Sequence, residues 1–477
     1  MSFSLRPNIS WLFILCVWCL APPATAQVLE ATVTPIASDA GIKQRPFISS
    51  ILDLTQYDYV EQEFILSGNA NTYDKAGKWL RDGMWDVTVS KADMPYATRM
   101  IVRRPEKQEN FNGMVVVEWL NNTAFMDVDV IWAQSHDELL REGYAWIGLS
   151  AQYLGVSALR SWDKERYGEL SIANDGLSYD IFSQAALAVR NQSELLLGGL
   201  TVTGIIGAGE SQSAIRLTTS VNAFQDSANE VYDAILIYSR FHLAAPLKAG
   251  ITALAPSRAY IRPDNRLKIL QLQTEQDIFM FLFRLARQDD TEFLRTWEVA
   301  GASHYDNYGV SFLLPQYQRD FPALGEISLN CRNSLNLVPQ RYVVNAALSH
   351  MSNWITTDQA PPQSTQIEYR NWKVVRDEHG NALGGIRLPE VEVPIATHNY
   401  ANSGSFTEGN WLINSFACPF LGNTVPFSDE KLQGLYSSHD EYVSQFTDAA
   451  MELVEAGFLL PADFNESVEN AKAVLIP

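Results

Sequence analysis

The chain has 477 residues, more than one compact core usually needs, so either one large domain with insertions or two domains are expected. Apolar residues make up 47% and charged residues 19%, a balance that is ordinary for globular proteins and argues against extensive disorder. With 35 Lys and Arg against 55 Asp and Glu, the formal charge is -20, which disfavours binding to nucleic acid or to anionic lipid.

The first residues have the pattern of a cleaved signal peptide. Arg6 precedes the apolar run 11–20 (WLFILCVWCL), and residues 24–26 (ATA) fit the small-residue cleavage pattern. The run is shorter than a bilayer span requires, although an uncleaved membrane anchor is the alternative interpretation. We therefore expect residues 1–26 to be removed and the mature chain to be exported, either to a periplasm or to the medium. We expect no integral membrane segment after cleavage.

From about residue 59 to residue 300, strand-like and helix-like stretches alternate. The predicted strands are 97–105, 113–120, 144–151, 201–209, 232–239, 267–273 and 293–301, and the predicted helices are 132–143, 179–196 and 212–224. Alternation of this kind predicts an α/β fold, with a mostly parallel central sheet and helices on both faces. We assign this core to residues 27–310.

After residue 305 the strand-helix rhythm is lost until a predicted helix at 438–456. No low-complexity linker separates this part of the chain, so we expect residues 311–477 to form a C-terminal region that packs on the core and covers the site. The mature chain keeps only Cys331 and Cys418, which form either one disulfide or two buried thiols. The mature chain contains no CxxC or His-x-x-His cluster that would indicate a metal site, and we expect no metal and no cofactor.

Ser211 lies in the sequence GESQS (209–213), between an apolar strand and a helix. A serine at such a tight turn projects its hydroxyl above the edge of the sheet, and the turn needs small residues two before and two after it. Gly209 and Ser213 meet that need, although the second differs from the glycine of the usual G-x-S-x-G pattern. The alternative is a serine that only caps the helix.

A nucleophilic serine needs a base, and the base needs an acid that orients it. In α/β-hydrolases these follow in the order serine, acid, histidine, each after a later strand. The strand 267–273 leads into Glu275 and Asp277, and the strand 293–301 leads into His304. We predict His304 as the base and Asp277 as the acid, with Glu275 as the alternative acid. A hydrogen-bonded structural role is the other interpretation of His304.

The negative oxygen that forms during acyl transfer needs two backbone N–H donors. We expect one from Gln212, directly after the serine, and the other from Asn121 or Asn122, which follow the strand 113–120. The two asparagines are alternatively turn formers. Glu210 and Trp119 are predicted to line the substrate pocket, although Trp119, like Glu118 beside it, is alternatively a packing residue only.

With these residues placed, the chain resembles the bacterial family called "alpha/beta hydrolase domain-containing". The stretches that carry the resemblance are VVVEWLNN (115–122), GESQSAIRL (209–217), LQTEQDI (272–278), RTWEVAGASHYD (295–306), VVNAALSHMSNWITTDQAPP (343–362), GGIRLPEVEVPIAT (384–397) and LYSSHDEYV (435–443). The resemblance implies a hydrolase core with a family-specific C-terminal region and carries over the serine, acid and histidine already named. It implies no particular substrate.

The resulting expectation is an exported serine hydrolase that cleaves a carboxylic ester of a small molecule through an acyl-enzyme. A serine peptidase or lactonase uses the same residues, and a non-catalytic binding protein on the same scaffold is the alternative from another class. The sequence leaves the oligomeric state open.

Overall fold

The computed structural model describes residues 29–224, 231–248, 258–324, 329–404 and 411–476. The predicted signal peptide, residues 1–26, lies outside these ranges. The described residues form a nine-stranded sheet in the order β1-β2-β3-β5-β4-β6-β7-β8-β9. Its strands are β1 (Thr32–Ile36), β2 (Tyr59–Ala76), β3 (Asp86–Pro105), β4 (Met114–Trp119), β5 (Ala145–Leu149), β6 (Gly204–Glu210), β7 (Ala234–Tyr238), β8 (Lys268–Thr274) and β9 (Leu294–Val299).

The strands from β5 to β9 run parallel to one another, which confirms the predicted mostly parallel sheet. Every residue of β4, β5, β6 and β7 is buried. Continuous apolar runs such as AILIY in β7 are typical of parallel strands covered on both faces, where neither side of the pleat meets water. The carboxyl ends of these strands meet at one edge, where β6, β8 and β9 end close to the predicted site residues.

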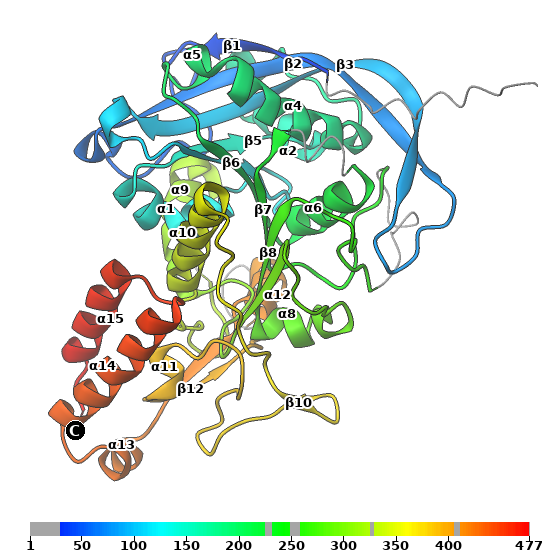
Figure 1. Cartoon of the computed structure of the whole chain (residues 1–477). Coiled ribbons are helices and arrows are strands. Elements are labelled where there is room, and N and C mark those ends of the chain that lie inside the picture. The colour runs from blue at the N-terminus through cyan, green and yellow to red at the C-terminus, as the bar shows by residue number, and fades with distance from the viewer. Residues whose placement is uncertain (1–28, 225–230, 249–257, 325–328, 405–410, 477) are drawn as a thin grey trace, which may run out of the picture.

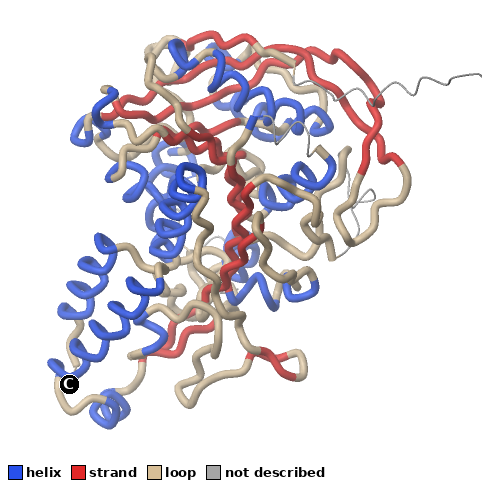
Figure 2. Tube along the Cα trace, in the orientation of Figure 1, coloured by secondary structure: helices blue, strands red, loops and turns tan. Residues whose placement is uncertain are grey.

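Helices cover both faces of this parallel part, as predicted. The helices of the core are α1 (Val130–Arg141), α2 (Tyr153–Trp162), α3 (Lys164–Tyr167), α4 (Ser178–Asn191), α5 (Ser193–Leu196), α6 (Gln212–Ala223) and α8 (Glu275–Phe279). Figure 1 shows α1, α9 (Asn307–Asp320) and α10 (Arg341–Thr357) on one side of β6 and β7 and α6 on the other, and Figure 2 shows these parallel strands between helices. None of the helices in the described ranges is long and apolar enough to cross a membrane.

An antiparallel extension widens the sheet beyond β5. β3 pairs antiparallel with β5, β2 with β3, and β1 with β2. The strand predicted at 97–105 is the end of the much longer β3, which begins at Asp86. The first half of β3 is largely exposed and polar, so its sequence lacks the apolar pattern from which a strand is predicted. Pairing with β2 along almost its whole length holds it extended.

The C-terminal region contains α9 (Asn307–Asp320), α10 (Arg341–Thr357), α11 (Pro389–Glu392), α12 (Trp411–Ala417), α13 (Asp429–Leu435), α14 (His439–Ala456) and α15 (Pro461–Ala473). Its short strands are β10 (Tyr369–Arg370), β11 (Lys373–Val374), β12 (Ala396–Asn399) and β13 (Asn423–Pro426). The helix predicted at 438–456 is α14, whereas α9, which contains Pro315, and α10 were not predicted. α10 packs on α1, β6 and β8. The boundary expected at residue 310 falls inside α9 and stays a prediction.

Candidate active site

Ser211 is the single residue between β6 and α6. Its backbone has φ 56° and ψ -111°, a conformation that a residue with a side chain rarely adopts, and its N–H donates to the Tyr238 carbonyl at 3.0 Å. A Cβ at Gly209 would lie 3.1 Å from the Ser213 Oγ, which is why the turn needs small residues on both sides. The strained turn places the Ser211 hydroxyl at the carboxyl edge of the sheet.

Hydrogen bonds join three predicted site residues in series. The Nε2 of His304 lies 2.7 Å from the Ser211 Oγ, and its Nδ1 lies 2.6 Å from the Asp277 Oδ1. The backbone N–H of His304 donates to the Gln276 Oε1 at 2.7 Å, which fixes the start of the loop that carries the imidazole. All three side chains are buried, with 6% of Ser211, 5% of His304 and none of Asp277 exposed.

The first turn of α8 separates the two candidate acids. The Oδ2 of Asp277 accepts hydrogen bonds from the N–H and the hydroxyl of Thr274, both at 2.8 Å, which leaves Oδ1 for His304. Glu275 points elsewhere, because its carboxylate accepts from the Gly301 N–H at 2.8 Å and pairs with Arg376 at 2.7 Å. The structure therefore brings Asp277, and not Glu275, to the histidine.

The predicted N–H donors differ in what they bind. The Asn121 N–H donates to the Val128 carbonyl at 3.1 Å, so it is already engaged. The Asn122 N–H donates to the Oε1 of the Gln212 side chain at 3.3 Å, a flexible acceptor that can move away. The Gln212 N–H begins α6, and a first helical N–H has no acceptor within its helix. Gln212 and Asn122 are thus the better placed donors next to Ser211.

The two predicted pocket residues lie in different places. Glu210 lines the cavity beside Ser211, and its Oε1 is 3.2 Å from the His304 Nε2. Trp119 lies in the core, where its ring packs on Phe182 and its Nε1 donates to the Gln152 Oε1 at 3.1 Å. It is not among the residues that line the Ser211 cavity, so this arrangement does not support its prediction as a substrate-binding residue.

The charges around His304 favour its protonated form. Burial lowers the pKa of His304, but the carboxylates of Glu210 and Asp277 more than offset this, so the pKa is raised above its usual value. Burial raises the pKa of Glu210 to about 8, which the proximity of His304 opposes and that of Asp277 reinforces. The imidazole thus has carboxyl groups at both of its nitrogens.

A cavity of about 240 Å³ opens over Ser211 and His304. Most of its wall is aliphatic or aromatic, and both the core and the C-terminal region contribute to it. The lining side chains are Asn121, Thr123, Ala124, Val128, Val130, Glu210, Ser211, His304, Tyr305, Val310, Leu313, Leu314, Tyr317, Leu329, Phe416, Ala417, Phe420 and Leu421. The cavity is suited to an apolar group next to the Ser211 hydroxyl.

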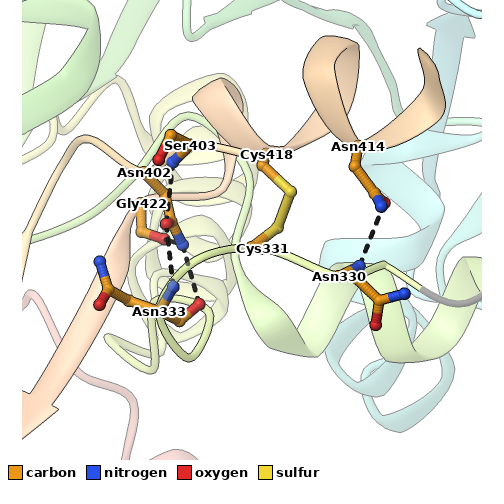
Figure 3. The surroundings of a disulfide bond; sticks show 8 residues. All are labelled: Asn330, Cys331, Asn333, Asn402, Ser403, Asn414, Cys418 and Gly422. Carbon is orange, nitrogen blue, oxygen red and sulfur yellow. Dashed lines mark hydrogen bonds between the residues drawn. A yellow bond between two sulfur atoms is a disulfide. The ribbon is translucent and has the colours of Figure 1, made fainter. Parts of the chain in front are cut away.

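A disulfide joins Cys331 to Cys418, with their Cα atoms 5.5 Å apart. Asn402 braces the same two segments, because its Nδ2 donates to the Asn333 carbonyl at 3.1 Å and to the Gly422 carbonyl at 2.7 Å (Figure 3). Cys418 begins the 3-10 turn that ends at Phe420, so the disulfide lies next to one wall of the cavity. Of the two states left open for these cysteines, the structure has the disulfide.

Three residues that contact His304 were not predicted. Gln276 lies in the predicted acid loop, so a search of that loop for hydrogen-bonding side chains would have found it. The rings of Phe281 and Phe420 lie 4.6 Å and 5.7 Å from the imidazole. Their place depends on the packing of segments that are distant along the chain, and no local pattern signals it.

This arrangement can move a proton from a serine hydroxyl to an imidazole that a carboxylate orients, which is the chemistry of nucleophilic acyl transfer. Within the described ranges, no group of three His, Cys, Asp or Glu side chains is placed to hold a metal ion. Hydrogen bonds bring the Ser211 hydroxyl, the His304 imidazole and the Asp277 carboxylate together.

Residues 32–469 match the family described as "Alpha/beta hydrolase domain". A comparison with curated proteins found no match. Among solved structures, a fungal esterase from Rhizomucor miehei is similar, with 11% identity and a TM-score of 0.34 over 63% of this chain and 85% of that one. A methylesterase, BT1017, has 11% identity and a TM-score of 0.32 over 57% and 54%. A serine hydrolase without a lid, XC6422 from Xanthomonas campestris, has 12% identity and a TM-score of 0.27 over 54% and 97%.

Proposed function

The chain belongs to this alpha/beta hydrolase family, and from that premise we propose that it is a serine hydrolase that cleaves carboxylic esters. The observation that carries the proposal is the hydrogen-bonded series Ser211–His304–Asp277, with its distances of 2.7 Å and 2.6 Å. A nucleophile, a base and an orienting acid in that order are the minimum that acyl transfer through a serine requires.

In the first half of the reaction, the His304 Nε2 accepts the proton of the Ser211 hydroxyl as the Oγ attacks the ester carbonyl carbon. Asp277 holds the Nδ1–H, so the lone pair of the imidazole faces the serine, and it stabilises the imidazolium that forms. The imidazolium then gives its proton to the leaving alcohol as the C–O bond breaks, which leaves the acyl group on Ser211.

In the second half, His304 accepts a proton from water as the water oxygen attacks the acyl carbon. The proton returns to the Ser211 Oγ when the acid product leaves, so the enzyme is restored with no net change. The N–H groups of Gln212 and Asn122 stabilise the negative oxygen in both halves. The Gln212 side chain, which accepts from the Asn122 N–H in the free protein, has to turn away for this.

The wall of the cavity supports an uncharged substrate. Its lining is mainly Val, Leu and Phe, and no Lys or Arg is among the lining residues. A cavity of about 240 Å³ lies below the usual range for drug-sized ligands of roughly 300–1,000 Å³, which favours an ester with a small or medium apolar group.

We further propose that the mature protein is exported and that residues 311–477 form one side of the substrate cavity. The N-terminal pattern supports export, and so does the Cys331–Cys418 disulfide, since such bonds persist in oxidising compartments. Leu329, Phe416 and Phe420, all beyond residue 310, line the cavity.

Hydrolysis of p-nitrophenyl esters from acetate to palmitate by the mature chain tests the proposal. We expect turnover of the shorter esters and a loss of kcat by at least ~10⁴-fold in the Ser211→Ala variant. The Ser220→Ala variant is the matched control, because Ser220 is a buried serine on α6, the helix that follows Ser211, and it lies outside the cavity wall. Equal turnover by the wild type and the Ser211→Ala variant would contradict the proposal.

Labelling with a serine-directed organophosphonate separates this enzyme from a binding protein on the same scaffold. We expect one covalent adduct per chain, located on Ser211 and absent from the Ser211→Ala variant. If no adduct forms and no ester or lactone is turned over, the scaffold alternative holds. Turnover of peptides in preference to esters would identify a peptidase instead.

A further inference from the structure

The Nε2 of His304 has two neighbours, although the proposed mechanism uses only one. The Ser211 Oγ lies 2.7 Å from it, and the Glu210 Oε1 lies 3.2 Å from it. Glu210 is the last residue of β6 and directly precedes the serine, so the same strained turn fixes both groups. No step of the proposed reaction uses the carboxyl group of Glu210.

Asn121 holds the Glu210 side chain in place. The Asn121 Nδ2 lies 3.0 Å from the Glu210 Oε2 and 3.0 Å from the Glu210 carbonyl oxygen, and it donates to both. Only 4% of Glu210 is exposed, and the adjacent cavity wall is apolar. The carboxyl group is therefore largely shielded from bulk water, and Asn121 holds it beside the imidazole.

Within the described ranges, Glu210 forms no ion pair with a Lys or Arg. Its titratable neighbours are His304 and Asp277, together with the phenols of Tyr238 and Tyr305. Burial raises the pKa of Glu210 to about 8, and the carboxyl groups on either side raise that of His304. Near neutral pH the pair Glu210–His304 therefore shares its protons, and its two titration steps belong to the pair rather than to either residue.

The position of the shared proton decides whether His304 can act as a base. When the imidazole carries the proton, it cannot accept one from Ser211. When the pair has lost both protons, the imidazole is neutral and a carboxylate lies 3.2 Å from the nitrogen that becomes positively charged in the transition state. A fixed negative charge at that distance in a buried site stabilises the imidazolium.

We propose that Glu210 is a positioning residue that acts through His304: as a carboxylate it stabilises the imidazolium from the Nε2 side, and it makes the enzyme more active at alkaline pH. This inference rests on the proposed function. It assigns to Asp277 the Nδ1 side of the ring and to Glu210 the Nε2 side. The imidazolium is then flanked by two carboxylates when the serine attacks.

The pH dependence of kcat/KM tests this inference in the wild type and in the Glu210→Gln variant. We expect kcat/KM of the wild type to rise in two steps and to reach its plateau only above pH ~8, because both groups have to lose a proton. In the Glu210→Gln variant we expect one step, shifted down by roughly 1 pH unit or more, and a plateau lower by about tenfold. Superimposable profiles would overturn the inference.

Glu275→Gln is the matched control. Glu275 is also a fully buried glutamate close to the site, but it is bound by Arg376 and the Gly301 N–H and not by His304. A carboxyl group that only supports the structure would change stability and leave the pH profile unmoved, as we expect for this control. A shift of equal size in both variants would contradict a specific role for Glu210.

Titration of His304 by NMR gives a readout that does not require turnover. We expect the His304 resonances, assigned by their loss in the His304→Gln variant, to titrate in two steps in the wild type and in one step at lower pH in the Glu210→Gln variant. A single-step titration of the wild type would overturn the inference even if the variant fails to fold. If no ester is hydrolysed but His304 titrates in two steps, the proposed function is rejected. The coupled titration of Glu210 and His304 is then still supported.

Discussion

Two cavities share the segment that carries His304, and each contains a buried glutamate. His304 and Tyr305 line the cavity of about 240 Å³ over Ser211, whereas the next three residues, 306–308, line a larger cavity of about 560 Å³ within the C-terminal region. Burial raises the pKa of Glu210 in the first cavity to about 8 and that of Glu390 in the second to about 7. By burial and pKa alone, the two glutamates look alike.

The two glutamates differ in the groups that lie next to them. The Glu210 Oε1 lies 3.2 Å from the His304 Nε2, whereas the Glu390 Oε2 has no hydrogen-bond partner within the described ranges. The histidine next to Glu390 is His398, whose Nε2 lies 3.2 Å from the Glu390 backbone carbonyl, and burial lowers the pKa of His398 to about 4. A raised pKa therefore reports burial, and the partner decides whether the group takes part in proton transfer.

Replacing Asp277, the acid beside His304, should cause the largest loss of activity. We expect the Asp277→Asn variant to lose about 10⁴-fold in kcat, because the amide no longer holds the imidazole in the productive tautomer or stabilises its charge. The Glu275→Gln variant should keep kcat within a fewfold of the wild type. Steady-state kinetics on one p-nitrophenyl ester compares them, and a larger loss in the Glu275→Gln variant would reverse the assignment.

Removal of the Cys331–Cys418 disulfide shows whether the wall between the two cavities depends on this covalent bond. Asn336 lines the larger cavity and Leu421 the smaller one, and the Asn336 N–H donates to the Leu421 carbonyl at 3.1 Å, within segments that the Cys331–Cys418 bond ties together. A bond between residues 87 positions apart contributes about 4.6 kcal/mol in the chain-entropy description.

We therefore expect the Cys331→Ser/Cys418→Ser double variant to lose up to about 4.6 kcal/mol in the free energy of unfolding, measured by urea denaturation. Its KM should rise, because Phe420 is two residues after Cys418 and lines the Ser211 cavity. An unchanged KM together with lower stability would show that packing alone holds the wall.

The glutamate of the larger cavity should affect stability and not activity. The folded state raises the pKa of Glu390 from 4.5 to about 7, so it binds this proton more tightly than the unfolded chain does. The stability that this gives is present below pH 4.5 and is lost as the pH rises through 7. Relative to the wild type, the Glu390→Gln variant should gain up to about 3 kcal/mol between pH 4 and pH 8.

Urea denaturation at both pH values measures this gain, and kcat/KM serves as the control, since Glu390 does not line the Ser211 cavity. A pH profile of activity that moves in the Glu390→Gln variant as it does in the Glu210→Gln variant would remove the distinction between the two cavities.

The smallest expected effect concerns the aromatic wall. The Phe420 ring lies 5.7 Å from both the His304 and the Phe281 rings. We expect the Phe420→Leu variant to lose roughly threefold to tenfold in kcat/KM for the preferred ester, because the smaller side chain removes part of the contact with the ester. Phe446→Leu, at a lining residue of the larger cavity, is the control and should leave kcat/KM unchanged.

The core of the fold could be predicted because its signals are local. The strands β6 to β9 and the helix α6 recur at their predicted positions. β6 and β7 are almost entirely apolar, as expected of parallel strands covered on both faces, and this pattern is readable from the sequence. The first half of β3 could not, because it is extended only through its pairing with β2. The helices α9 and α10 were not predicted for a similar reason. Packing against other segments stabilises them more than the apolar pattern of their own sequences indicates.

For the site, the sequence by itself determined the candidates: Ser211 at a strand-helix turn, two carboxyl groups after β8 and His304 after β9. Only the tertiary structure distinguishes the surroundings of Asp277 and Glu275, because residues two apart on the first turn of α8 point in different directions, to His304 and to Arg376. It also paired the two cysteines and brought Phe420 to the imidazole. A motif records the order of groups along the chain, whereas a hydrogen bond or a pocket wall depends on distances between segments that only the folded chain sets.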